Sequence, residues 1–261
     1  MSAIVKEAAS PIIQNIPNEP VPQNPNCDYL WHILEEAVDQ FTDDIDKFVD
    51  FVVELQKLPD GDRVFEQLPQ FRNHWTEFGY RMTDWPSDEE DREAKRQAQT
   101  NQHAFLAKLS TRGVPEYDQI GRAGFTFRST CEFAPWEIVH FPDIEERYDE
   151  EDDEDWPETR DRELELYSIK ILNAKVPAAA QWIRWVGQRV YEMEGEIEGE
   201  FEWQNEALNS KWNGEKGCSK ERFAFWRKRF EWISTVTALE KDTQRIAREC
   251  AELMKKIEIE K

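Results

Sequence analysis

The sequence contains four histidines, and Glu137 and His140 together form the clearest candidate for a metal-binding pair. They form a Glu-x-x-His step, which is one element of the carboxylate-bridged di-metal sites of helix bundles. Such a site needs a second step and two more glutamates from facing helices, and the sequence contains no second step. Pro135 and Pro142 would also interrupt the helix that has to position the first step. We therefore expect no metal site.

The acidic run Asp143–Asp155 could attract calcium, since it holds ten acidic residues and one arginine. It lacks the glycine at position six and the closing glutamate of an EF-hand loop. A run of like charges repels itself and cannot pack into a core. We expect a solvated acidic loop near residues 143–158 between two structured parts.

Cys218 is a candidate nucleophile, because it precedes an expected helix start, where the helix dipole lowers a thiol pKa. No histidine lies near it in the sequence to complete a nucleophile pair. The HExxH, phosphate-loop, dinucleotide-binding and nucleophile-elbow motifs are missing. We expect no catalytic residue and no cofactor, and we favour a non-enzyme while leaving an enzyme open.

The segment Gly217–Ile233 interleaves aromatic and basic residues, as a groove for single-stranded nucleic acid would. At about 100° per residue, however, four of its apolar residues share an arc of roughly 80° on one helix face: Phe223, Trp226, Phe230 and Ile233. The net charge of −22 also opposes phosphate. The pattern predicts a buried helix face, and we do not expect nucleic acid as a partner.

Helical spacing of apolar residues recurs along the chain, and no alternating strand pattern is present. We expect an all-α fold, a multi-helix bundle or array of antiparallel helices. The expected helices are Tyr29–Leu58, Pro69–Met82, a helix capped by Ser87 that ends at Gly113, Val114–Phe133, a helix with Pro177 at its start, and one helix from Ser219 nearly to the C-terminus.

The first 26 residues hold five of the 13 prolines. Proline removes a donor and fixes φ, so we expect residues 1–26 to be a flexible tail without helix, and residues 27–261 to form a single helical domain. No apolar stretch is long enough to span a membrane, no secretory signal is evident, and the four cysteines are far apart. These features favour a cytoplasmic protein, with the nucleus left open.

Two functions fit these observations. The first is a non-enzymatic module that binds another protein or a second copy of itself, because Lys211–Lys261 carries 13 basic against 9 acidic residues within a very acidic chain. The second is a small-molecule-binding protein or enzyme with an aromatic pocket between helices. Its ligand-binding candidates are Trp182, Trp185, Phe223 and Trp226.

Three blocks resemble a family of helical proteins of filamentous fungi that is catalogued as a domain of unknown function: Asn101–Val114, Val176–Gly187 and Gly217–Phe230. The resemblance implies a fungal, intracellular, mostly helical protein, in some cases encoded beside genes of specialised metabolism, and it supplies no catalytic residues. The chain departs from the family pattern at Gln102 and His103, where leucine and asparagine are expected, and in its longer acidic insertion.

Overall fold

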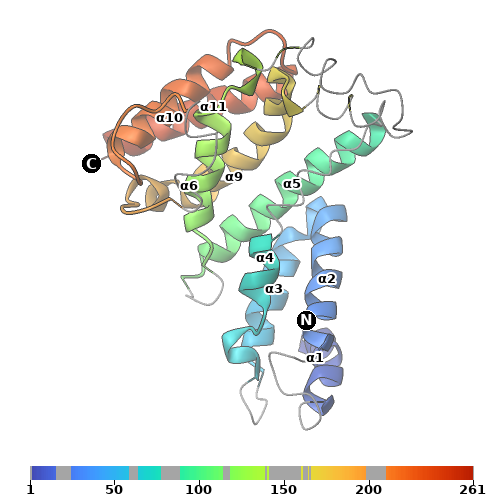
Figure 1. Cartoon of the computed structure of the whole chain (residues 1–261). Coiled ribbons are helices and arrows are strands. Elements are labelled where there is room, and N and C mark those ends of the chain that lie inside the picture. The colour runs from blue at the N-terminus through green and yellow to red at the C-terminus, as the bar shows by residue number, and fades with distance from the viewer. Residues whose placement is uncertain are drawn as a thin grey trace.

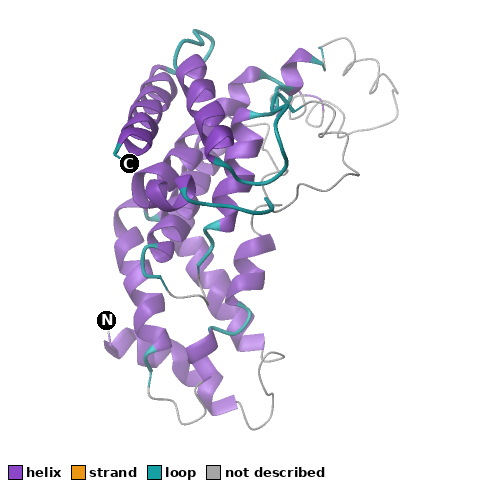
Figure 2. Cartoon of the chain, turned by 90° about the vertical axis from the view of Figure 1, so that its left-hand side faces the viewer, coloured by secondary structure: helices purple, strands orange, loops and turns teal. Residues whose placement is uncertain are grey.

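A computed structural model describes most of the 261 residues: 2–15, 25–58, 64–77, 89–113, 118–138, 140, 160, 164, 166–197 and 210–260. In these ranges the secondary structure is helical, and helices pack on helices without a named strand (Figure 2). The predicted all-α fold is therefore confirmed. The acidic run Asp143–Asp155 and the capping residue Ser87 lie outside the described residues.

Two groups of helices are joined by the long helix α5, Glu89–Ser110. Figure 1 shows α1 to α4 in the lower part of the molecule and α6, α9, α10 and α11 in the upper part, with α5 running between them. Helix α5 packs against α2 and α3 on one side and against α9 on the other. One apolar cluster extends through both groups, from Val5 on α1 to Ile257 on α11.

Helix α1, Ser2–Asn15, lies in the segment for which the sequence predicted no helix, and that prediction is wrong there. Three apolar residues, Val5, Ala9 and Ile12, recur at helical spacing and are buried. Burial of this stripe on α2 and α3 outweighs the one backbone hydrogen bond that Pro11 removes from the helix. Residues 16–24 lie outside the described part of the chain.

The single helix expected over Tyr29–Leu58 is in fact two, which corrects the prediction. Helix α2 covers Pro25–Gln40 and α3 covers Ile45–Gln56, with the 3-10 turn Thr42–Asp44 between them. Phe41 leaves the helical region at φ −115° and ψ 78°. Threonine and aspartate compete with the helix for backbone hydrogen bonds, and this explains the break. The turn lets α3 contact both α1 and α2.

The middle helices follow the sequence more closely. Helix α4 covers Phe71–Glu77 and α6 covers Gly121–Cys131, each inside its predicted range. Gly113 lies beyond the end of α5 with φ +65°, a left-handed conformation that favours glycine at a helix end.

Helix α9, Leu172–Tyr191, begins five residues before Pro177, so the prediction of a proline at its start is wrong. The 3-10 turn Ile169–Ile171 leads into it. Leu172, Ala174 and Val176 precede the proline and are buried. Their burial favours the extra turn, although Pro177 cannot donate a backbone hydrogen bond.

The last predicted helix is also two: α10, Lys220–Ile233, and α11, Lys241–Ile259. Ser234 and Thr235 donate their hydroxyls to the carbonyls of Glu231 and Trp232, both at 2.7 Å, and these bonds satisfy the end of α10. Helix α11 then packs on α9 and α10.

The buried face predicted for the first of these helices is confirmed. Phe223, Trp226, Phe230 and Ile233 are at most 1% exposed, so this face of α10 forms core, while Trp232 on another face is 37% exposed.

Candidate functional site

The two aromatic candidates on α9 have different environments. Trp182 is fully buried, and its Nε1–H donates to Nδ1 of His103 at 2.8 Å. Trp185 is 42% exposed, and the ammonium of Lys108 lies 4.5 Å from its ring centroid. One of the two side chains is therefore part of the core and the other lies at the surface.

The two candidates on α10 lie in the core beside other rings. Phe223 packs edge-on against Tyr191 at 5.1 Å between centroids, and Trp226 stacks on Phe127 at 5.2 Å. Neither they nor the two α9 tryptophans line the pocket described below. A ligand-binding role for the four aromatics stays a prediction.

A buried ion pair holds α6 and α10 together. The Glu132 carboxylate accepts from Nε and Nη2 of Arg222 at 2.7 and 2.8 Å and from Nε1 of Trp226 at 2.7 Å. Nη1 of Arg222 donates to the Gly217 carbonyl at 3.0 Å. These bonds engage both oxygens of a fully buried carboxylate, so the cluster fixes the position of α10 against the end of α6.

Two neighbouring polar residues of α5, Gln102 and His103, make tertiary contacts. Gln102 is buried and donates to a carboxylate oxygen of Asp39, and His103 accepts from Trp182. The preceding Asn101 donates to the Val38 and Asp39 carbonyls at 3.1 and 3.0 Å, which caps the end of α2. These polar residues attach α5 to α2 and α9.

Burial raises the pKa of Asp39 to about 7, with a further contribution from the charge of Glu35, while the bond from Gln102 works in the opposite direction. In the folded protein Asp39 therefore binds a proton between pH 3.8 and 7 that the unfolded chain does not. This contribution to stability is present at low pH and is lost as the pH rises through 7.

Asp39→Asn should consequently stabilise the protein more at pH 8 than at pH 5, where the folded protein still holds the proton. We expect a gain of about 1–2 kcal/mol, reduced for partial solvent screening, because asparagine still accepts the bond from Gln102 without a charge. Urea unfolding at both pH values measures it. Equal effects at pH 5 and pH 8 would contradict the assignment.

The remaining sequence candidates form no chemical site among the described residues. Glu137 pairs with Lys211 at 2.6 Å, and His140 is exposed. The backbone N–H of the buried Cys218 donates to the Gly195 carbonyl at 2.7 Å. Within the described part of the chain no group of three or more potential ligands could hold a metal ion.

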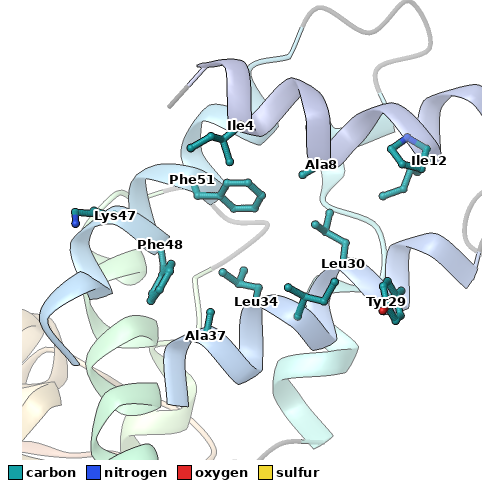
Figure 3. Close-up of a pocket in the computed structure, with 12 residues that line it drawn as sticks. Ile4, Ala8, Ile12, Tyr29, Leu30, Leu34, Ala37, Lys47, Phe48 and Phe51 are labelled. Carbon is teal, nitrogen blue, oxygen red and sulfur yellow. The ribbon is translucent and has the colours of Figure 1, made fainter. Parts of the chain in front are cut away.

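An apolar pocket lies between α1, α2 and α3 (Figure 3). Its volume is about 540 Å³. The lining residues are Ile4, Ala8, Pro11 and Ile12 of α1, Tyr29, Leu30, Ile33, Leu34 and Ala37 of α2, and Lys47, Phe48 and Phe51 of α3. Only Tyr29 and Lys47 among them carry a polar side-chain atom, and Figure 3 places these two at opposite ends of the pocket. The interior is therefore suited to hydrocarbon.

The rim of this pocket is also apolar and open to solvent. Ile4 is 61% exposed, Tyr29 67% and Ile33 51%. The Lys47 ammonium at one end is held by Asp44 at 2.6 Å. Exposed apolar residues clustered at a pocket are typical of a binding surface.

This pocket was not expected from the sequence, because one of its three walls is α1 and no helix was predicted over residues 1–26. The spacing of Ile4, Ala8 and Ile12 was readable as one helix face, but the proline count outweighed it. Phe48 and Leu34 were recognised as part of an apolar stripe. A stripe alone, however, does not say whether a neighbouring helix covers it completely.

Comparison with known proteins identifies a family whose function is unknown. The family model described as "Protein of unknown function (DUF3632)" matches residues 31–230, a range that contains all three blocks of the resemblance. No curated protein and no solved structure matches the chain. None of the described helices is long and apolar enough to cross a lipid bilayer.

Proposed function

We propose, from the premise that this chain belongs to the DUF3632 family of proteins of unknown function, that it is a non-enzymatic protein-interaction module. Its pocket between α1, α2 and α3 accepts the apolar side chains of a helix from a partner protein. The observation that carries this proposal is the apolar pocket with an exposed apolar rim.

The shape of the pocket favours an amphipathic helix. The α2 residues that line it, from Tyr29 to Ala37, extend over about 12 Å of helix. This length matches two turns of a partner that presents apolar side chains at i, i+3 or i+4, and i+7. Helix α1 already packs on α2 and α3 through such a stripe, so these helices provide a surface that takes one helix and leaves space beside it.

The chemistry of the lining favours a protein segment over a polar substrate. Small polar molecules are held by several converging polar groups. Here the two polar side-chain atoms lie at opposite ends, and the other lining side chains are hydrocarbon. Apolar burial, at about 25 cal/mol per Å², is the main driving force that such a surface can supply.

Ile33→Gln tests the proposal with a fluorescent peptide helix that has leucines at i, i+3, i+4 and i+7 and uncharged polar residues elsewhere. We expect the wild-type protein to bind it and the variant to bind at least about fivefold more weakly, because about 1 kcal/mol of apolar contact is lost. Fluorescence anisotropy measures the Kd. Ile33 is half exposed, so the fold should tolerate glutamine.

Ile259→Gln is the matched control, because Ile259 is 70% exposed on α11, outside the pocket. It should leave the Kd unchanged. Equal binding by wild type and Ile33→Gln, with both folded by circular dichroism, would exclude the pocket as the binding surface.

A second candidate is binding of a small apolar molecule, which the volume of about 540 Å³ favours, since ligand pockets span roughly 300–1,000 Å³. An apolar fluorophore that binds wild type but not Ile33→Gln, in the absence of any peptide binding, would select it. Quenching of tryptophan fluorescence by a ligand that Trp185→Ala abolishes would instead support the aromatic set predicted from the sequence.

A further inference from the structure

We propose that the partner helix is cationic, with lysine and arginine flanking its apolar stripe. This inference rests on the proposed function and specifies the partner of the same pocket. Its basis is the distribution of charge on the three helices that form the pocket.

The described residues 2–15 and 25–58, which contain these helices, carry ten acidic residues against three lysines. Two of the lysines are already engaged: Lys47 pairs with Asp44 at 2.6 Å and Lys57 with Glu54 at 3.0 Å. The surplus negative charge therefore stays uncompensated by the pocket's own helices.

The side of α3 that faces α5 is neutralised within the fold. Asp46 pairs with Lys108 at 2.7 Å, and Asp50 pairs with Arg112 at 3.0 Å. These carboxylates have partners on α5 and just after its end, and they are not part of the pocket. Ion pairs within the fold therefore neutralise the acidic residues on this side of α3. Three exposed acidic residues nearer the pocket have no such partner among the described residues.

Three exposed carboxylates on the pocket's helices and on the turn before α3 form no ion pair with the described residues: Glu7, Glu36 and Asp43. Each lies within about one helical turn of a lining residue in the sequence. Glu36 follows the rim residue Ile33 by three positions, and Glu7 follows Ile4 by three. The elements that line the apolar opening thus carry exposed negative charge, on α1, on α2 and before α3, that no described cation neutralises.

Charge at the rim determines which helix can approach. An anionic helix would bring like charges together at a desolvated rim, and this repulsion costs affinity. A cationic helix gains attraction and a faster encounter, both of which weaken as salt screens the charges over about 10 Å at 0.1 M. Apolar contact supplies the affinity for any amphipathic helix, while the rim supplies the preference for a cationic one.

Three peptides with the same apolar stripe test the inference: one flanked by Lys and Arg, one by Glu, and one by Gln and Ser. In anisotropy titrations at ~50 mM salt we expect the cationic peptide to bind at least about tenfold more tightly than the anionic one. The difference should shrink at ~300 mM salt. A cationic peptide with scrambled apolar positions should bind weakly.

The double variant Glu36→Gln/Asp43→Asn should reduce the cationic-to-anionic preference at least about threefold, while binding of the uncharged peptide stays constant. The control Glu249→Gln/Glu252→Gln removes the same charge from exposed positions on α11. It should leave the preference near its wild-type value, which separates the rim from the overall charge of −22.

The outcomes separate the two proposals. Equal affinity for all three peptides, lost in Ile33→Gln, would overturn the cationic preference and keep the protein-binding function. Absence of peptide binding would overturn both. A preference that falls equally in the α11 control would show general electrostatic attraction and overturn the inference. Sedimentation experiments could show a concentration-dependent dimer that Ile33→Gln abolishes. The occupant of the pocket would then be a second copy of the chain, and the inference of a cationic partner helix would be overturned.

Discussion

Replacement of Glu132 by leucine is expected to lower the free energy of unfolding by about 3–5 kcal/mol, the largest single effect we predict. The substitution leaves the guanidinium of Arg222 buried without its counter-ion, and Nε1 of Trp226 loses its acceptor. Because both charged side chains are at most 1% exposed, water cannot replace the carboxylate. Urea denaturation followed by circular dichroism measures the loss.

Glu137→Leu provides the matched control, because its pair with Lys211 is partly exposed. We expect a change of less than about 1 kcal/mol, as for other surface pairs. The double variant Glu132→Leu/Arg222→Leu should be more stable than Glu132→Leu alone, since it buries no unpaired charge. If the two glutamate variants lost equal stability, the buried pair would not be the dominant link between α6 and α10.

The second large effect concerns acid stability and His103. Burial lowers the pKa of His103 to about 3, and the charge of Arg122 adds to the shift. Below pH 6.5 the unfolded chain therefore binds a proton that the folded protein cannot bind, so stability falls as the pH decreases from 6.5 towards 3. The slope is about 1.4 kcal/mol per pH unit, which gives about 2–3 kcal/mol between pH 6.5 and 4.5.

His103→Gln should remove this loss, because glutamine does not titrate and can still accept from Nε1 of Trp182. Chemical denaturation at pH 4.5, 5.5, 6.5 and 8 measures the difference from wild type. His140→Gln serves as the control, since His140 is exposed. Parallel pH profiles for wild type and His103→Gln would show that the histidine does not govern acid stability.

Asp39 acts in the opposite direction over the same range, because its raised pKa makes the folded protein the better proton binder between pH 3.8 and 7. The two groups partly cancel in the wild-type protein. Asp39→Asn should therefore make stability fall more steeply as the pH is lowered. In His103→Gln, stability should instead rise as the pH is lowered. A nearly flat profile between pH 4.5 and 6.5 is expected when both substitutions are combined.

Local features of the sequence were sufficient for the helices whose boundaries depend on short-range signals. The helix start at α10 is an example: the Ser219 hydroxyl accepts from the backbone N–H of Arg222 at 3.1 Å, and the buried face follows from residue spacing alone. The three family blocks were recognisable for the same reason, since each lies within or beside one element and inside the matched range 31–230.

The breaks at Phe41–Asp44 and Ser234–Glu240 could not be derived in this way. In both places an apolar stripe continues through the break, so the periodicity resembles that of one long helix. The chain turns because folding back buries more apolar surface on a second helix than a straight helix could bury alone. Serine, threonine and aspartate side chains then lower the free-energy cost of the turn, because they supply hydrogen bonds to the backbone groups that leave the helix.

The sequence by itself determined the fold class, the buried face of α10 and the family, because the spacing of apolar residues and short capping signals are local properties of the chain. Only the tertiary structure decided that α1 is a helix, that Gln102 and His103 serve α2 and α9, and that a pocket remains beside α1. These features depend on which surfaces meet across long sequence separations. A pocket forms where helices pack incompletely. The distance between two helices that are far apart in the sequence cannot be predicted from a local residue pattern.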